Sequence, residues 1–376
     1  MHLLQIHNYY RHAGGEEQTM NAERDLLQNH GHSVVQLTAH NNHLFRPFVH
    51  RKFMNNLKKL LKTNNFDVAH VHNVFQIIGS EVYVELHKAK IPIVQSIHNF
   101  RFFCINGLFL NNENKTCELC LNNDFRYAVQ KKCYHNSALW SMLMRYQVRK
   151  AKQEVLKSVN IFVPLNNFAQ QKFIAGGFPK DRLIVKPNFL FSQNNNNSTY
   201  NSYALYLGRI SPEKGLDFFL QTIKSIDFQF IIAGTGVEYE TLKTKFSENK
   251  NIQFVGFVSG SEKEKLINES AFMVMPSLCY ENFPISILEA YQNAKAVVAP
   301  DFGSFSYNVI HNKTGLLYKQ NDANSLKQTI ETMIENENYI KLGKQAQQHF
   351  ETNLTDKQNY LQLINIYNQA IENKRK

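Results

Sequence analysis

The sequence lacks any apolar run long enough to cross a membrane, because none reaches the ~18 residues that a transmembrane helix needs. Its first residues, M-H-L-L-Q-I-H, lack a basic leader and a small-residue cleavage site, so we do not expect a signal peptide. Charged residues make up only 19% of the chain and hydrophobic residues 43%, which is typical of a globular protein. We therefore expect a cytoplasmic protein. Its 376 residues are too many for one ordinary core and fit two domains.

Acidic residues are scarce in the first half of the chain. Residues 1–190 carry 24 Lys and Arg against 12 Asp and Glu, whereas residues 191–376 carry 18 against 19. A nucleic acid, an anionic membrane surface or an anionic acceptor would each suit a basic half, and so would a generally basic proteome. Residues 45–62 alternate apolar residues with cations at helical spacing. That pattern suits a helix lying on a membrane and equally a surface helix with snorkelling lysines.

Short β-branched runs alternate with helical patterns along the chain, which is typical of parallel βαβ units and predicts an α/β fold. We predict strands at 2–7, 33–37, 68–71, 91–96 and 161–163, and then at 203–207, 228–233, 252–254, 272–275, 296–299 and 315–318. We predict helices at 16–30, 45–64, 79–90, 137–157 and 166–175, and then at 214–225, 236–247, 260–269, 284–293, 323–336 and 338–352.

A polar segment divides the chain. The stretch S-Q-N-N-N-N-S-T-Y-N-S is low in complexity and cannot build a core, so we predict an interdomain linker over 191–202. The two domains are then 1–190, with a cysteine-rich insert at 104–133, and 203–355. The remaining residues, 356–376, carry an apolar stripe at helical spacing and predict a last helix.

A basic motif follows the first strand of the second domain. In G-R-I-S-P-E-K-G, residues 208–215, Arg209 and Lys214 can supply the two cations that a pyrophosphate needs.

A second motif, E-N-F-P-I-S-I-L-E at 281–289, spaces Glu281 and Glu289 as E-x7-E. Pro284 suits the first turn of a helix, whose first amides form a positive end that can bind phosphate. These amides belong to the residues near Phe283, Ile285 and Ser286. Anion-binding amides between two carboxylates indicate a ligand with both phosphates and hydroxyls, such as a sugar nucleotide.

Together with two upstream motifs, this pattern resembles retaining glycosyltransferase family 4. The four motifs occur in the family's order: Gly14-Gly15, His98, Arg209 with Lys214, and Glu281 with Glu289. The resemblance is strong from about residue 203 to 318 and looser from 1 to 188. It implies the GT-B fold, in which two Rossmann-like doubly wound domains face each other across a ligand-binding cleft and the last helix crosses back to the first domain. It also implies a nucleotide-sugar donor and retention of the anomeric configuration.

The resemblance gives each motif a role. Arg209 and Lys214 bind the diphosphate, Glu289 holds the ribose hydroxyls, and Glu281 contacts the transferred sugar, which His98 also approaches. The donor-binding positions implied besides these are Gly14, Gly15, Gly234, Gly236, Asn282, Phe283, Pro284 and Ile285. The chain has no D-x-D motif, so we expect no metal or other cofactor in catalysis.

Four cysteines lie in the insert as C-x12-C-x2-C-x12-C. Four thiolates around a central C-x2-C pair suit a structural zinc site, because they leave no coordination position open for catalysis. Two disulfides are the rival, which a reducing cytoplasm disfavours, and unliganded thiols are the third interpretation. The residues concerned are Cys104, Cys117, Cys120 and Cys133.

We predict transfer to a saccharide acceptor carried on a polyprenyl diphosphate, in the biosynthesis of a surface polysaccharide of the O-antigen or capsule type. The basic first domain would then contact the membrane. One alternative is a GT-B-fold sugar-nucleotide epimerase, for which no acid/base residues are evident. The other is a zinc-stapled nucleic-acid-binding protein, because aromatic residues interleave with cations at 101–103 and 125–127. Such a protein would not need E-x7-E, so we expect no nucleic acid.

Overall fold

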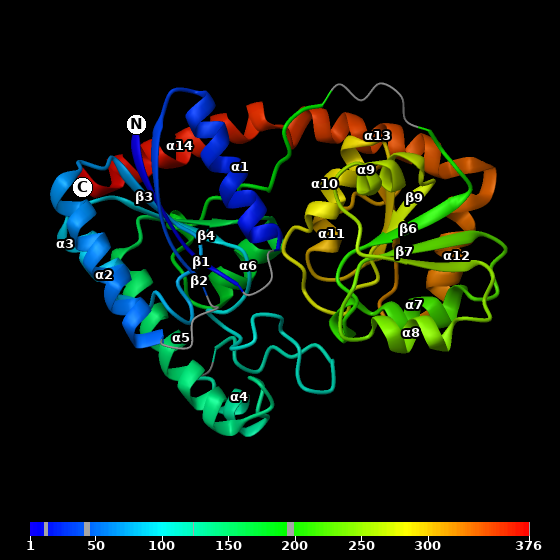
Figure 1. Ribbon diagram of the computed structural model, residues 1–376, viewed down its shortest axis with the longest axis horizontal. Helices are drawn as coiled ribbons and strands as arrows, with labels where there is room; N and C mark the ends of the chain where they lie inside the picture. The colour runs from blue at the N-terminus through cyan, green and yellow to red at the C-terminus, as the bar shows by residue number, and fades with distance from the viewer. Residues whose placement is uncertain (11–13, 41–45, 123, 194–198, 376) are drawn as a thin grey trace. The chain divides into compact units, whose positions relative to one another are not determined.

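A computed structural model of the chain describes residues 1–10, 14–40, 46–122, 124–193 and 199–375 (Figure 1). It divides into two compact units. Unit 1 comprises Met1–Asn112, Cys117–Asn188 and Asp356–Lys376, and unit 2 comprises Glu113–Thr116 and Phe189–Thr355. Residues 194–198 of the predicted linker, and Phe45 at the start of the predicted 45–64 helix, lie outside the described residues.

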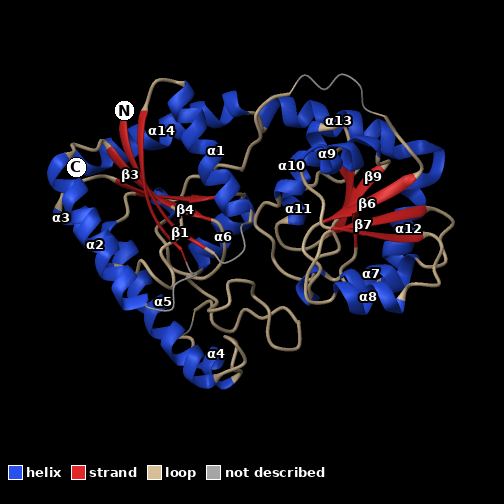
Figure 2. Ribbon diagram, viewed as in Figure 1, coloured by secondary structure: helices blue, strands red, loops and turns tan. Residues whose placement is uncertain are grey.

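Unit 1 is built on a parallel five-stranded sheet (Figure 2). The strands in sheet order are β2 (Ser33–His40), β1 (His2–Tyr9), β3 (Val68–Val71), β4 (Ile93–Ile97) and β5 (Ile161–Pro164). Both faces are covered, so β3, β4 and β5 are buried at every residue and read as apolar runs in the sequence. The order places the switch point of the sheet between β1 and β3.

Eight helices of unit 1 lie among its described residues. They are α1 (Gly15–Asn29), α2 (Arg46–Thr63), α3 (Glu81–Lys88), α4 (Arg126–Gln130), α5 (Ala138–Ser158), α6 (Asn167–Ala175), the 3-10 turn η1 (Lys180–Arg182) and α14 (Asp356–Arg375). The last helix covers one sheet face, where Leu363, Ile366 and Tyr367 pack against Leu3 and Val94. The predicted C-terminal helix is thus part of unit 1.

Helix α2, for which the sequence suits a membrane contact and a surface helix equally, buries its apolar side. Phe53, Met54 and Leu57 of α2 are 9% exposed or less and lie in the core, whereas Arg51 and Lys52 are exposed. Over residues 49–63, the outer surface of α2 is therefore polar and cationic, as in the surface-helix interpretation. In the described part of the chain, no helix is long and apolar enough to span a bilayer.

Unit 2 holds a parallel six-stranded sheet. In sheet order its strands are β11 (Gly315–Tyr318), β10 (Ala296–Pro300), β9 (Phe272–Val274), β6 (Tyr203–Leu207), β7 (Gln229–Ala233) and β8 (Ile252–Gly256). Its helices and 3-10 turns are η2 (Pro212–Lys214), α7 (Leu216–Ile223), α8 (Tyr239–Lys245), α9 (Gly260–Glu269), α10 (Ile285–Gln292), α11 (Phe305–Asn308), α12 (Ala323–Ile334), η3 (Glu335–Glu337) and α13 (Asn338–Asn353). The switch point lies between β6 and β9.

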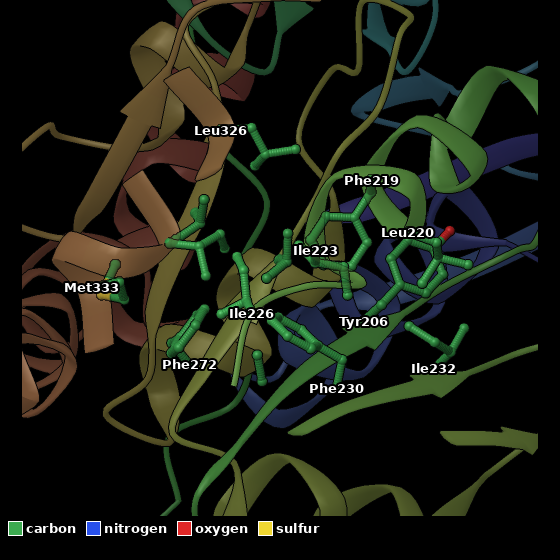
Figure 3. Packing of buried hydrophobic residues seen from close by; sticks show 14 of the residues in the cluster. Tyr206, Phe219, Leu220, Ile223, Ile226, Phe230, Ile232, Phe272, Leu326 and Met333 are labelled. Atoms are coloured by element: carbon green, nitrogen blue, oxygen red, sulfur yellow. The ribbon is translucent and has the colours of Figure 1, made fainter. Parts of the chain in front are cut away.

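Each face of this second sheet has its own core. On one face α7 contributes Leu216, Phe219, Leu220 and Ile223, which recur at helical spacing and pack with Phe230 and Ile232 of β7 (Figure 3). The opposite face packs β-strand residues against α10 and α13, including Leu288 and Phe350. Two buried faces hold the sheet rigid, so the segments that leave its carboxyl edge start from defined positions.

Candidate functional site

Both predicted motifs of unit 2 meet at its switch point. Arg209 and Lys214 lie in the segment that leaves β6, and Glu281 lies in the segment that leaves β9, the neighbouring strand. In open α/β sheets, ligands bind outside the carboxyl ends of the strands at this position. The structure thus brings together residues that 67 positions of sequence separate.

Lys214 and Glu281 form an ion pair there. The ammonium of Lys214 donates to Oε1 of Glu281, which also accepts from the hydroxyl of Ser277 at 2.9 Å. The two charged side chains are only 21% and 16% exposed. The pair is therefore shielded from bulk water without being closed off from a ligand.

Burial and pairing act in opposite directions on the two pKa values. Burial lowers the pKa of Lys214, but the carboxylate of Glu281 outweighs it, so this pKa lies above its usual value. Burial raises the pKa of Glu281, but Lys214 and the bond from Ser277 bring it below its usual value. Both groups are charged at neutral pH, and the site presents a cation beside an anion.

Arg209 occupies a more exposed part of the same segment. Its side chain is 63% exposed, and its Nη2 lies 2.9 Å from Oε1 of Glu213. The Tyr206 hydroxyl donates to the Arg209 carbonyl at 2.6 Å and so holds the backbone at the end of β6. An exposed ion pair of this kind is weak, so Arg209 can exchange Glu213 for a phosphate at little cost.

The helix that follows Glu281 begins one residue later than predicted. Pro284 is the N-cap of α10, with φ −59° and ψ 130°, rather than a first-turn residue. The amides of Ile285 and Ser286 head the helix, where no preceding turn offers them carbonyls, and form its positive end. Asn282 is buried and its carbonyl accepts from Asn308 at 2.8 Å, which anchors the predicted segment Asn282–Phe283 to α11.

Glu289 lies in the second turn of α10 and has a partner that the sequence did not reveal. Lys263 of α9 donates to its Oε1 at 2.6 Å, and the carboxylate is 16% exposed. The carboxylate is thus held by a cation from a neighbouring helix. No motif marks Lys263, since its reach depends on how α9 packs beside α10.

Gly234 and Gly236 permit two backbone segments to approach closely. Gly234 has φ +135°, and a Cβ there would lie 1.8 Å from the carbonyl oxygen of Gly208. A Cβ on Gly236 would lie 2.1 Å from the carbonyl oxygen of Ile210. These glycines therefore bring the segment after β7 against the one that carries Arg209, and their predicted contact with a nucleotide stays a prediction.

In unit 1, Gly14 and Gly15 begin α1 after β1, as predicted. Gly14 is the N-cap, and its amide donates to Oε2 of Glu17 at 2.7 Å. This carboxylate, which is 3% exposed, also accepts from the amide of Tyr10 at 3.2 Å. Burial and Glu17 raise the pKa of the adjacent Glu16 to about 8. The helix start therefore already holds one carboxylate, where the sequence predicted a phosphate contact.

His98 follows β4 and joins a chain of histidines. Its Nε2 lies 3.0 Å from Nδ1 of His72, and the two rings stack with centroids 5.3 Å apart. His70 next along β3 contacts the Tyr367 hydroxyl at 2.9 Å and the Ser96 hydroxyl at 2.8 Å. Burial and the surrounding cationic groups hold the pKa of His98 well below its usual value, so the ring is neutral. No motif in the sequence links His70 and His72 to His98.

A buried ion pair lies beneath these histidines. Glu23 and Lys186 are each 1% exposed, and Nζ of Lys186 lies 2.7 Å from Oε1 of Glu23. Glu23, His70 and His72 place ligand atoms within 4.8 Å of one another. However, Lys186 already neutralises the carboxylate and both nitrogens of His70 contact hydroxyls, so this cluster suits a hydrogen-bonded network better than a cation.

Residues 188–349 match the family model described as "Glycosyl transferases group 1". This part of the chain belongs to that family. The matched segment contains both motifs at the switch point of unit 2, so the glycosyltransferase domain includes Arg209, Lys214, Glu281 and Glu289.

Known proteins resemble the chain beyond this domain. An uncharacterised glycosyltransferase of Methanocaldococcus jannaschii is 31% identical over 45% of this chain and 49% of its own, so the chain spans about half the length of that relative. A UDP-Gal:alpha-D-GlcNAc-diphosphoundecaprenol alpha-1,3-galactosyltransferase of Escherichia coli is 24% identical over 73% of this chain and 68% of its own.

A solved structure shares the fold. Anabaena HepE, crystallised with UDP, superposes with a TM-score of 0.69 at 15% identity and covers 97% of this chain and 99% of its own. With the two doubly wound sheets, this likeness confirms the predicted GT-B fold class around the glycosyltransferase domain.

The four insert cysteines are outside the glycosyltransferase domain, in unit 1. All are free thiols. Burial and then the neighbouring cysteines raise the pKa of Cys120 to about 12 and that of Cys133 to about 11, so the thiols lie within electrostatic reach of one another. In the described part of the chain, no three of their sulphur atoms lie within 4.8 Å of one another. A metal would therefore require Cys104, Cys117, Cys120 and Cys133 to close around it.

Proposed function

We propose that the protein transfers a sugar from a nucleoside diphosphate sugar to a saccharide acceptor, with retention of anomeric configuration. The observation that carries this proposal is the Lys214–Glu281 pair at the switch point of a group 1 glycosyltransferase domain. It places a cation suited to phosphate beside a carboxylate suited to sugar hydroxyls.

In the proposed reaction, the bond from the anomeric carbon to the phosphate oxygen breaks, and a bond to the acceptor oxygen forms on the same face. The leaving phosphate takes the acceptor proton. Lys214 and Arg209 hold the diphosphate and stabilise the charge that develops on it as the bond breaks. The amides that head α10 supply further positive charge.

The two carboxylates of the E-x7-E motif act on hydroxyl groups. Glu281 is held ionised by Lys214, so it can only accept, which suits two hydroxyls of the transferred sugar. Glu289 accepts from the ribose in the same way and exchanges part of its bond to Lys263 for it. In unit 1, we assign His98 to the transferred sugar and the Gly14–Gly15 turn to the donor phosphates or the acceptor.

We further propose that the acceptor is a saccharide on a polyprenyl diphosphate and that the product belongs to a surface polysaccharide. The E. coli relative is named for an acceptor with a diphosphoundecaprenol group. The basic character of residues 1–190 suits such an anionic acceptor.

The experiment is a donor screen followed by two variants. Thermal shift with UDP, GDP and their sugars identifies the donor, and mass spectrometry then follows its hydrolysis and transfer with and without EDTA. We expect Lys214→Ala to slow transfer about 10²–10³-fold and Glu289→Ala to weaken nucleotide binding about tenfold or more. EDTA should leave the rate unchanged.

Lys245→Ala is the matched control, because this lysine is exposed in α8 and pairs only weakly with Asp217. It should keep the wild-type rate. Wild-type rates in Lys214→Ala and Glu289→Ala would contradict the proposed roles, and a product of inverted configuration by NMR would contradict retention.

We also propose a structural zinc ion in the insert. The support is chemical: four free thiols at C-x12-C-x2-C-x12-C spacing lie within reach of each other's charge. Elemental analysis of protein purified under reducing conditions should find about one zinc per chain, and Cys120→Ala should lose it. Protein that contains no metal after reductive purification, and whose melting temperature does not change when zinc is added, would rule the site out.

A further inference from the structure

Helix α5 has two apolar faces, and only one of them is needed for the core. Met144, Val148, Ala151 and Val155 recur at helical spacing and are buried against unit 1. In the same helix, Leu139, Met142, Leu143 and Tyr146 recur at the spacing i, i+3, i+4 and i+7 on another face. These four side chains are 60%, 51%, 46% and 68% exposed.

We call Leu139, Trp140, Met142, Leu143 and Tyr146 the α5 patch. Five of the thirteen large hydrophobic side chains that are exposed in the described part of the chain belong to it, although it spans only residues 139–146. Single exposed apolar residues are ordinary on protein surfaces, but a contiguous group marks a contact surface.

A hollow runs beside the patch. It has a volume of about 460 Å³, and its walls include Phe75, Ile77, Trp140, Leu143 and Tyr146. A second hollow of about 610 Å³ also has Met142 and Tyr146 in its walls, but the rest of its lining is polar or charged and includes Arg149, Lys150 and Glu154. The patch therefore offers projecting side chains and one largely apolar recess, with cations beside them.

Cations outnumber acids around the patch, although Glu81 and Glu154 line the two hollows beside it. Residues 126–153 contain seven Lys and Arg and no Asp or Glu. Just outside this range, Asp124 accepts from Arg145 at 2.6 Å, and Glu81 pairs with Lys150. Lys131, Lys132 and Arg149 are all exposed near the N-terminal half of α5. The surroundings of the patch are therefore net positive.

We propose that the α5 patch docks this protein on an anionic phospholipid bilayer. Aliphatic side chains enter the boundary between headgroups and acyl chains, Trp140 and Tyr146 lie at headgroup depth, and the surrounding cations face lipid phosphates. The largely apolar hollow beside the helix gives acyl chains a place to pack, and the cations of the second hollow face the headgroups. The proposal places the membrane contact of the basic first domain on α5, because α2 buries its apolar side in the core.

Two other occupants suit the patch less well. A second copy of the chain would bring one set of cations against an identical set, which is unfavourable in a symmetric interface. A nucleic acid would use the cations and aromatic rings but would have no contact for Leu139, Met142 and Leu143. A lipid surface uses the aliphatic and the cationic side chains together.

The inference rests on the proposed function for its purpose, since a docked enzyme meets a lipid-linked acceptor. Its test does not need that function. Binding of the full-length protein to vesicles is measured by sedimentation, with pure phosphatidylcholine compared with phosphatidylcholine containing phosphatidylglycerol, at low and high salt. Binding should require the anionic lipid and weaken at high salt.

The chain contains a single tryptophan, Trp140, so its intrinsic fluorescence reports on the patch. On anionic vesicles the emission should shift to shorter wavelength, and lipids brominated on their acyl chains should quench it. Neither change should occur with phosphatidylcholine alone. An emission spectrum that is unchanged while the protein sediments with vesicles would show that another surface binds and would overturn the proposal.

Substitutions separate the two contributions. Leu143→Ser with Tyr146→Ser should weaken vesicle binding about tenfold or more per side chain, and Lys131→Gln with Lys132→Gln about fivefold per cation. Leu361→Ser is the control, because Leu361 is 56% exposed on α14, away from the patch. It should bind as the wild type does. Unchanged melting temperatures show that each variant is folded.

Three results would overturn the proposal. The Leu143→Ser/Tyr146→Ser variant could bind vesicles as the wild type does; the wild type could be a dimer that this variant loses; or the variant could lose oligonucleotide binding as much as it loses vesicle binding. Nucleotide binding, followed by thermal shift with UDP and GDP, keeps the two hypotheses apart. If the wild-type protein binds nucleotide but no vesicles, only the proposed docking surface is contradicted. If it binds vesicles but no nucleotide, only the proposed activity is contradicted.

Discussion

Buried lysines of unit 2 differ in charge because their neighbours differ. Lys214 faces Glu281, which holds its pKa above the usual value. Lys295 is 0% exposed, and among the described residues, which leave out 194–198, its ammonium meets a carbonyl, that of Thr199, and the ring of Tyr200 at 3.9 Å. Burial without a carboxylate lowers the pKa of Lys295 to about 7. One lysine is thus a permanent cation, and the other titrates near neutral pH.

Lys295→Met should therefore stabilise unit 2 in a pH-dependent way. Below pH 7 the folded protein pays for a buried charge that the unfolded chain keeps in water, and this penalty fades as pH rises from 7 toward 10.5. We expect the free energy of unfolding of the variant to exceed that of the wild type by a few kcal/mol at pH 6. This difference between variant and wild type should narrow by pH 10.

Chemical denaturation at several pH values measures this gap. Lys319→Met, at a lysine that is 80% exposed, should show no such trend. A gap that stays constant from pH 6 to 10 would mean that Lys295 keeps its ordinary pKa in the folded protein.

At this scale the sequence located residues better than their partners. Arg209, Lys214, Glu281 and Glu289 are marked by spacing within short motifs, and the structure places all four in the glycosyltransferase domain. Lys263 was not foreseen, because its contact with Glu289 depends on the packing of two helices that no local pattern encodes. The same holds for the pairing of His72 with His98 across neighbouring strands.

At the scale of elements, the strands were predicted well because burial on both faces leaves a clear apolar run. Predicted and observed ends of β3, β6 and β11 coincide. The short helices α4 and α11 were missed, since five and four residues are too few to show helical periodicity. The predicted helix at 214–225 is interrupted at Gly215, whose φ of +67° separates η2 from α7.

Gly234→Ala should disrupt the crossing of the segments that follow β6 and β7. The added Cβ would lie 1.8 Å from the carbonyl oxygen of Gly208, and φ +135° is unfavourable for alanine. We expect a loss of more than about 2 kcal/mol of stability, together with weaker binding of UDP or GDP in a thermal shift assay.

Gly31→Ala tests whether backbone strain alone explains that loss. Gly31 also has a positive φ, +78°, but a Cβ there would meet nothing within 4 Å. It should cost about 1 kcal/mol and leave nucleotide binding unchanged. Equal effects of the two substitutions would show that the close approach at Gly208 is unimportant.

At the scale of the whole molecule, helix α14 belongs to the same unit as the N-terminal strands, although it follows unit 2 in the sequence. Tyr367 of α14 is fully buried and contacts His70 of β3, so the core of unit 1 includes residues from both of its sequence segments that α14 and β3 represent. The apolar stripe predicted this helix, but the sequence pattern alone did not show which sheet it covers. Its place came from the resemblance to a known family.

Tyr367→Ala should therefore destabilise unit 1 and spare unit 2. Removing a fully buried aromatic side chain costs about 3–5 kcal/mol. Hydrogen exchange followed by mass spectrometry should show lost protection in β3 and β4, with β6 and β9 unchanged. Leu361→Ala, at an exposed position of the same helix, should leave both units as they are. Equal loss of protection in both units would show that they unfold together.

The cap on α1 has a consequence for ligand selection. Because the carboxylate of Glu17 already binds the Gly14 amide, an incoming anion must displace a resident rather than fill a vacancy. Binding of an anion at this turn would be an exchange, so its net free energy would be the difference between the binding of that anion and the binding of the Glu17 carboxylate. In the proposed reaction, a donor phosphate that contacts this turn would therefore have to replace the Glu17 carboxylate on the Gly14 amide.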